Sequence, residues 1–186
     1  MNHVSATCLA YALGRYPGAV ADTSGKASAS RRAPARWWPD GVTLAKPVET
    51  LPPRNALPGG CLYEPKWDGY RALIRVDGDG ARIRSRRGTD LTSAFPDVAA
   101  AAAEQLHPGT LLDGELVIWN RDAKGLDFAA LQRRLASAPR VTRLVAEQPA
   151  SFVAFDILLD GGVALAGRPL RDRRRALEEC PRRGLM

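Results

Sequence analysis

The sequence predicts a single α+β domain built on an antiparallel sheet. Residues 71–76 alternate in the manner of a strand, with the apolar side chains of every second residue on one face. The run Asp-Gly-Asp-Gly at 77–80 is a hairpin turn signal, and residues 81–86 return as a second strand. Helix-like and strand-like segments then follow in a chain of 186 residues, which is long enough for one domain with its own core.

The segments that follow the hairpin are assigned from similar signals. Residues 95–106 are predicted to form a helix, with a proline in the first turn, an alanine run behind it and a Pro-Gly stop at 108–109. Residues 111–119 are predicted to form a strand that is broken at Asp113-Gly114. His107 lies at the predicted helix end, where we expect a structural role.

The remaining elements complete the predicted domain. Residues 127–136 are predicted to form a helix with Asp127 as its N-cap, because its apolar residues fall on one side. Residues 151–159 are predicted to form a buried strand and residues 160–162 a turn. The basic segment 170–179 is predicted to form an exposed helix.

The first 41 residues differ from the rest of the chain. Residues 22–35 are rich in Ser, Ala, Lys and Arg without periodicity, so residues 1–41 are predicted to be a disordered tail. The Trp-Trp-Pro run at 37–39 is expected to dock on the domain, with nucleic-acid stacking as the alternative. The domain itself is predicted to span residues 42–186.

Composition narrows the class of protein. The net charge of +7 makes a polyanionic partner plausible, although the excess is mostly arginine in a chain rich in alanine and arginine. Cys8, Cys61 and Cys180 are odd in number and widely spaced, which argues against disulfides and a zinc site and predicts a cytoplasmic location. Residues 4–13 match a signal peptide poorly, and no apolar run is long enough to span a bilayer, so no membrane partner is expected.

The strongest chemical signal is the run K-x-D-G-x-R that begins at Lys66. It lies between an extended apolar stretch and the strand at 71–76. A lysine amine next to a cation such as Arg71 and in a shielded site suits nucleophilic attack on a phosphate. A surface hairpin could carry the same residues by chance, so further motifs are needed.

Three later segments follow in order, namely S-R-R-G at 85–88, L-D-G-E-L-V at 112–117 and F-V-A-F-D-I at 152–157. Together with the first run and with L-D-F-A-A-L-Q-R-R-L at 126–135, they resemble the nucleotidyltransferase motifs of ATP-dependent DNA ligases of the bacterial type. The resemblance covers about residues 42–180. It implies an antiparallel-sheet ligase adenylation fold, related to the ATP-grasp fold and incomplete at its C-terminus.

The resemblance also implies roles for named residues. Lys66 is expected to attack the α-phosphate of ATP and to hold AMP, which family members pass to the 5′-phosphate of nicked double-stranded DNA in repair and recombination. The expected nucleotide-binding residues, which hold adenine, ribose or phosphate, are Glu64, Arg71, Arg86, Glu115 and Phe155. Glu115 is also the candidate ligand for Mg²⁺ or Mn²⁺. Asp113 and Asp156 are expected to cap the backbone or to pair with arginines.

The sequence departs from the family after Phe155. The E-G-x-x-x-K and K-x-K segments are absent, and the OB-fold domain that clamps DNA is absent as well. We therefore expect a truncated adenylation domain with weak or absent ligation on its own, unless a separate chain supplies the missing half. The alternatives are an inactive remnant that binds nucleotide or DNA, an RNA ligase or capping-type nucleotidyltransferase, and an unrelated basic domain.

Overall fold

The computed structural model describes residues 38–39, 42, 48–57, 59–136 and 141–183, so the predicted tail at 1–41 lies almost wholly outside the described residues. Six strands form one sheet in which all pairs are antiparallel, with the order β2-β1-β3-β5-β6 and with β4 paired to the end of β3. The strands are β1 (Tyr70–Asp77), β2 (Gly80–Ser85), β3 (Thr110–Asn120), β4 (Gly125–Leu126), β5 (Ala150–Asp160) and β6 (Val163–Ala164). The predicted fold class is thereby confirmed.

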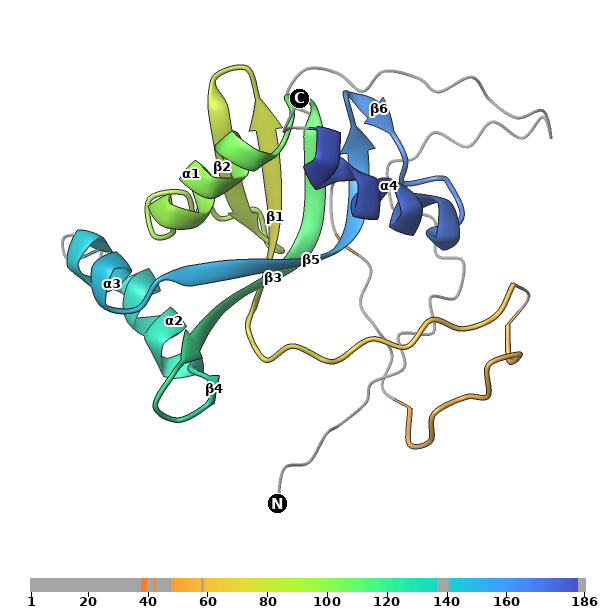
Figure 1. Ribbon diagram of the computed structural model, residues 1–186, viewed down its shortest axis with the longest axis horizontal. Helices are drawn as coiled ribbons and strands as arrows, with labels where there is room; N and C mark the ends of the chain where they lie inside the picture. Colours follow the sequence, from red (N-terminus) through yellow and green to blue (C-terminus); the bar gives the residue numbers. More distant parts are fainter. Residues whose placement is uncertain (1–37, 40–41, 43–47, 58, 137–140, 184–186) are drawn as a thin grey trace.

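Four helices accompany the sheet (Figure 1). They are α1 (Pro96–Gln105), α2 (Phe128–Ala136), α3 (Val141–Glu147) and α4 (Leu170–Arg183). Helix α1 packs on β1 and β2, α4 packs on β5, and α2 packs on the far part of β3, where β3 and β5 extend beyond the hairpin. Within the described part of the chain, no helix has the length and apolarity that crossing a membrane requires.

The core occupies both faces of the sheet because strand residues alternate. On β1, Ala72, Ile74 and Val76 face α1 and α2 in one cluster, which also contains Phe95. Leu73 points to the other face and joins a second cluster from β3 and β5, against which Trp38 and Val42 pack. Trp38 therefore docks on the domain, as expected for the Trp-Trp-Pro run.

Several local predictions are confirmed. The hairpin pairs Asp77 with Gly80 across the predicted turn. Helix α2 is capped as expected, because the carboxylate of Asp127 accepts a hydrogen bond of 2.8 Å from the backbone N–H of Ala130. His107 is structural, since its imidazole joins Asp160 at the β5–β6 turn.

The prediction that β3 is broken at Asp113-Gly114 is wrong. The strand runs through both residues, and only its register with β5 shifts there, as in a β-bulge. The ring of Phe152 occupies the space beside Gly114, where an added Cβ would lie 2.4 Å from the ring carbon Cζ. The glycine therefore accommodates a large neighbour instead of ending the strand.

Three further predictions need correction. Helix α4 is not an exposed helix that ends at Glu179, because it continues to Arg183 and buries Arg173 and Cys180. The first helix begins at Pro96, and Phe95 is a buried core residue before it. Helix α3 and the short strands β4 and β6 were not predicted.

The arginines of the second strand segment, Arg82, Arg84 and Arg86, lie in different surroundings. Arg84 is half-buried, and its guanidinium lies 4.6 Å from the ring centroid of Trp38, which is a cation–π contact. Arg82 pairs with Asp79 on the surface, as a solvated side chain would. Arg86 lies beyond the strand and does not share its face.

Candidate functional site

Lys66 lies in a segment of irregular structure that leads into β1. Residues 61–68 are neither helix nor strand, and the Lys66 side chain is exposed. The segment passes beneath the sheet and enters β1 at the end where Tyr70 pairs with Leu116 of β3 (Figure 1). The amine is therefore accessible to a ligand at this end of the sheet.

Gly69 allows this segment to press against β3. A Cβ at Gly69 would lie 2.3 Å from the carbonyl oxygen of Leu116, 2.7 Å from Cγ of Glu115 and 2.9 Å from Cγ1 of Val117. A side chain of any size would therefore displace the segment. The glycine of the K-x-D-G run is needed for close backbone approach, and this approach brings Lys66 and Asp68 near Glu115.

Glu115 is a half-buried carboxylate on β3 that faces this segment. Burial raises the pKa of Glu115 to about 7, while the charges of Arg71 and Lys66 lower it and those of Asp113 and Asp68 raise it. Two cations and two further carboxylates thus act on one side chain. Such a perturbed group, surrounded by charges, is typical of a functional site.

Arg71 is opposite Glu115 in the β1–β3 register and is held in place by Asp113, two residues earlier on β3. Its Nε and Nη2 donate to the two carboxylate oxygens of Asp113, at 3.1 and 2.8 Å, and Asp113 is fully buried. The Arg71 guanidinium also lies 5.2 Å from the centroid of the Phe155 ring on β5. Lys66, Arg71, Glu115 and Phe155 therefore gather on one face, at one end of the sheet.

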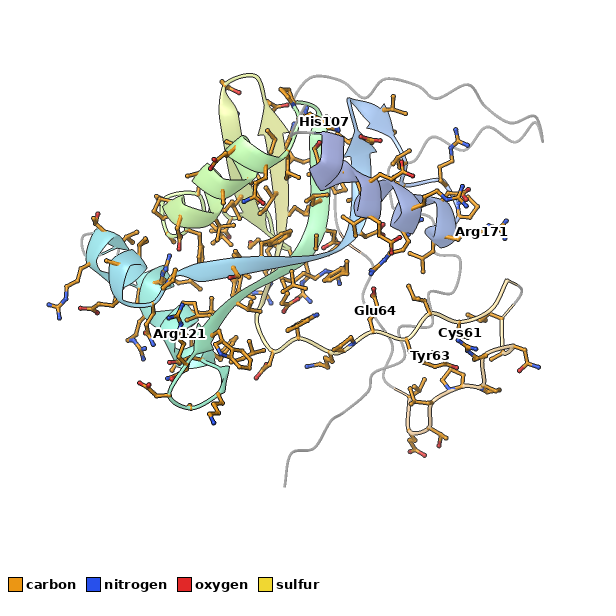
Figure 2. All side chains as sticks on the ribbon, in the orientation of Figure 1. Cys61, Tyr63, Glu64, His107, Arg121 and Arg171 are labelled. Carbon is orange, nitrogen blue, oxygen red and sulfur yellow. The ribbon has the colours of Figure 1, made fainter. Side chains whose placement is uncertain are left out.

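Glu64, two residues before Lys66, faces α4 (Figure 2). Its carboxylate accepts a hydrogen bond from Nη1 of Arg174 on that helix. The Glu64 side chain is half-buried and ion-paired. The arginine partner was not found from the sequence, because no local pattern links residues so distant in the chain.

Arg86 follows Ser85, the last residue of β2, which pairs with Ala72 next to Arg71. It lies exposed in the turn Ser85-Arg86-Arg87-Gly88, where the backbone N–H of Gly88 donates to the carbonyl of Ser85 at 2.9 Å. Gly88 has a φ of 86°, a conformation that favours glycine. The predicted strand at 81–86 therefore ends one residue early, at Ser85, and Arg86 lies exposed in the turn that follows.

The two aspartates expected to pair with arginines do so. Asp113 pairs with Arg71, and Asp156 pairs with Arg173 of α4 through two hydrogen bonds of 2.8 Å. The second pair is buried on both sides and joins α4 to β5. Asp113 therefore orients a candidate site residue, whereas Asp156 fixes α4 to the sheet.

The carboxylates around Lys66 suit a metal that arrives with a nucleotide. Among the described residues, no group of three or more His, Cys, Asp or Glu side chains is arranged to hold a metal ion. Mg²⁺ is commonly bound by one or two carboxylates together with substrate phosphates and water. Glu115 and the nearby Asp68 could supply these one or two carboxylates.

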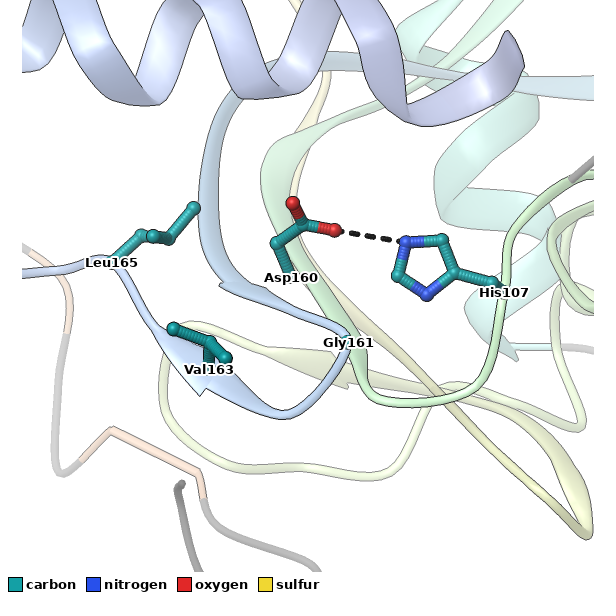
Figure 3. Close-up of a pocket in the computed structure, with 5 residues that line it drawn as sticks. All are labelled: His107, Asp160, Gly161, Val163 and Leu165. Carbon is teal, nitrogen blue, oxygen red and sulfur yellow. Dashed lines mark hydrogen bonds and ion pairs between the residues drawn. The ribbon is translucent and has the colours of Figure 1, made fainter. Parts of the chain in front are cut away.

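A separate pocket lies at the opposite end of the sheet (Figure 3). It has a volume of about 520 Å³ and is lined by His107, Asp160, Gly161, Val163 and Leu165. The imidazole of His107 is 2.9 Å from Asp160 and 3.3 Å from the hydroxyl of Thr110. These contacts join the loop at His107 to the end of β5, which is a structural role. The hydroxyl of Thr110 is fully buried, so it is not available for reaction.

Comparison with known proteins gives one family match. Residues 43–183 match the family described as ATP dependent DNA ligase domain. DNA ligase C2 of Mycolicibacterium smegmatis is 43% identical over 125 residues, which is 67% of this chain and 35% of the relative. DNA ligase C of Mycobacterium tuberculosis is 41% identical over 138 residues, which is 74% of this chain and 36% of the relative.

A solved structure is also similar. The ligase domain of M. tuberculosis LigD is 36% identical, with a TM-score of 0.49, and the alignment covers 62% of this chain and 35% of that chain. This chain spans about a third of the length of the relatives that it matches.

Proposed function

The chain belongs to the family of ATP-dependent DNA ligase domains, and from this membership we propose that it provides the adenylation site of a DNA ligase, with Lys66 as the nucleophile. One observation carries the proposal: Gly69 presses the segment of Lys66 against β3, beside Glu115 and Arg71. The exposed amine then lies next to groups that can bind a nucleotide.

The proposed reaction is transfer of AMP to the lysine. The deprotonated amine of Lys66 attacks the α-phosphorus of ATP, a P–N bond forms, and the bond to the β-phosphate oxygen breaks to release pyrophosphate. The nitrogen loses a proton in the process. This step needs a positioned amine and neutralisation of the phosphate charge, and Arg71, oriented by Asp113, is suited to the second task.

The other candidates are assigned to parts of the nucleotide. Phe155 is proposed to stack on adenine, because its ring lies beside Arg71 on the face of the site. Glu64 is proposed to accept a hydrogen bond from the adenine amino group. Glu115 is proposed to bind the ribose hydroxyl or the metal ion. Arg86 is proposed to contact the phosphate of AMP or of a nick from its exposed turn.

A divalent ion, Mg²⁺ or Mn²⁺, is proposed to bind with ATP and to neutralise charge on its phosphates. Glu115 would hold it, with Asp68 nearby. Asp113 is not proposed as a ligand of the ion, because its carboxylate is already paired with Arg71.

The proposed partner is nicked double-stranded DNA. The AMP would pass to the 5′-phosphate at the nick, and the 3′-hydroxyl would then displace it to join the strands. The net charge of +7 supports binding to a polyanion. A separate chain that supplies further ligase elements is also part of this proposal.

Intact-mass analysis tests the first step. The protein is incubated with ATP and Mg²⁺ or Mn²⁺ beside the variant Lys66→Ala, and circular dichroism verifies that both are folded. The proposal predicts a gain of one AMP in the parent protein and none in the variant. A folded parent protein that gains no AMP, with either metal, would favour the inactive remnant. A nick-sealing assay on the same samples tests whether the chain alone completes ligation.

A further inference from the structure

Arg174 on α4 joins two carboxylates that are far apart in the sequence. Its Nη1 donates to Oε1 of Glu64, and its Nε donates to Oε1 of Glu178 at 2.9 Å. Glu178 lies one helical turn after Arg174, so it holds the guanidinium on the face of α4 that meets Glu64. The contact with Glu178 therefore helps to orient the Arg174 guanidinium toward Glu64.

Glu64 depends on such contacts because its own backbone has no regular structure. Residues 61–68 belong to neither helix nor strand. One neighbouring anchor is the hydroxyl of Tyr63, which donates to the carbonyl of Pro52 at 2.6 Å. Of the two Glu64 oxygens, Oε1 is bound to Arg174, while Oε2 has no partner among the described residues.

Helix α4 is a firm support for Arg174. The preceding residue, Arg173, forms the buried two-point ion pair with Asp156 of β5. Cys180 of the same helix is buried in a cluster with Leu112 and Ile157 of the sheet. Two neighbouring arginines thus perform different tasks, since Arg173 fixes the helix to the sheet and Arg174 reaches across to Glu64.

We propose that Arg174 is a positioning residue for recognition of the nucleotide base. Its guanidinium holds one oxygen of Glu64 and leaves the other free to accept a hydrogen bond from the 6-amino group of adenine. This inference rests on the proposed function, which assigns Glu64 to that amino group. It adds a residue outside the ligase motifs and makes α4 part of the specificity of the site.

The experiment compares Arg174→Gln with the parent protein in the formation of lysyl-AMP. The KM for ATP should rise by about tenfold, because a charge-assisted hydrogen bond that orients Glu64 is lost. The maximum rate should stay within about twofold, since Arg174 touches no reacting atom. The preference for ATP over inosine triphosphate, which has a 6-oxo group in place of the amino group, should fall by a similar factor.

Two further variants separate positioning from a general structural effect. Arg175→Gln removes an exposed positive charge from the next residue of the same helix and should leave the KM and the base preference unchanged. Arg174→Lys should restore part of the preference because it retains the positive charge. In a Glu64→Gln background, the further change Arg174→Gln should add less than about twofold, since coupled residues act through one contact.

Equilibrium binding of ATP and inosine triphosphate to the intact chain distinguishes failure of this inference from failure of the proposed function. If the parent protein forms no lysyl-AMP but still prefers ATP, and Arg174→Gln loses that preference, only the catalytic proposal fails. If Arg174→Gln retains the full preference for ATP in binding and in AMP transfer, Arg174 does not position Glu64. An equal loss in Arg175→Gln would also overturn the inference, because the effect would then be one of net charge.

Discussion

Arg71 of β1 reaches diagonally across the sheet to the fully buried Asp113 of β3 and binds both of its carboxylate oxygens. Asp113→Asn should destabilise the fold by about 3 kcal/mol, because it removes one partner of a buried ion pair. It should also slow AMP transfer, since the orientation of Arg71 is lost. Urea denaturation and intact-mass kinetics measure the two effects.

Asp79→Asn is the matched control for this change. Asp79 pairs with Arg82 on the surface, where both side chains are well exposed, so its loss should cost less than about 1 kcal/mol. Similar losses in both variants would show that burial of Asp113 adds nothing to the strength of its pair.

Glu115 should make stability depend on pH. Burial raises the pKa of Glu115 to about 7 from 4.5, so the folded protein binds a proton more tightly than the unfolded chain. Between these two values the folded state holds more protons, and the free energy of unfolding should therefore fall as the pH rises from 4.5 to 7. Denaturation in metal-free buffer across this range measures the slope.

The variant Glu115→Gln should remove most of that slope, because the amide does not titrate. It should be as stable as the parent protein near pH 4.5 or slightly less so, and relatively more stable near neutral pH. An unchanged slope in the variant would mean that another group carries the pH dependence.

Gly69→Ala should reduce AMP transfer while most of the fold remains. The added Cβ would meet the backbone oxygen of Leu116 at 2.3 Å, which forces the segment of Lys66 away from β3. A misplaced nucleophile reduces rates on the order of a hundredfold. Gly78→Ala is the control, since nothing lies within 4 Å of its added Cβ and its φ is not positive. Equal activity in the two variants would show that the close approach is not needed.

Phe155→Leu should weaken ATP binding because the stacking surface for adenine is removed. Loss of one base–aromatic stack corresponds to about 1–3 kcal/mol, so the KM for ATP should rise by about tenfold or more. Phe155→Tyr retains the ring and should bind ATP almost as the parent protein does. The KM for lysyl-AMP formation measures the effect, and a normal KM in Phe155→Leu would exclude the stacking role.

Much of the fold could be predicted because its signals are local. The turn at 77–80 and the N-cap at Asp127 each depend on residues a few positions apart. Helix α3 was missed since its seven residues include two valines and a threonine, which are weak helix formers. The bulge at Gly114 could not be predicted because it depends on the ring of Phe152 on another strand.

The candidate site could be proposed from the sequence as a set of residues, but its geometry could not. The motifs pointed to Lys66, Arg71 and Glu115, and the structure brings these three together. The contact of Arg71 with Phe155 and the role of Gly69 in pressing on β3 depend on sheet register, which the sequence does not specify. The Glu64–Arg174 pair depends on packing of α4 and had no sequence signal.

That pair has a consequence for the order in which the protein matures on the ribosome. Glu64 and Arg174 are 110 positions apart, so the acid emerges long before its partner is synthesised. The hairpin β1–β2 and its pairing with β3 involve much closer residues and can form earlier. The proposed base recognition by Glu64 would therefore be among the last properties that the nascent chain acquires, after the sheet beside which Lys66 lies.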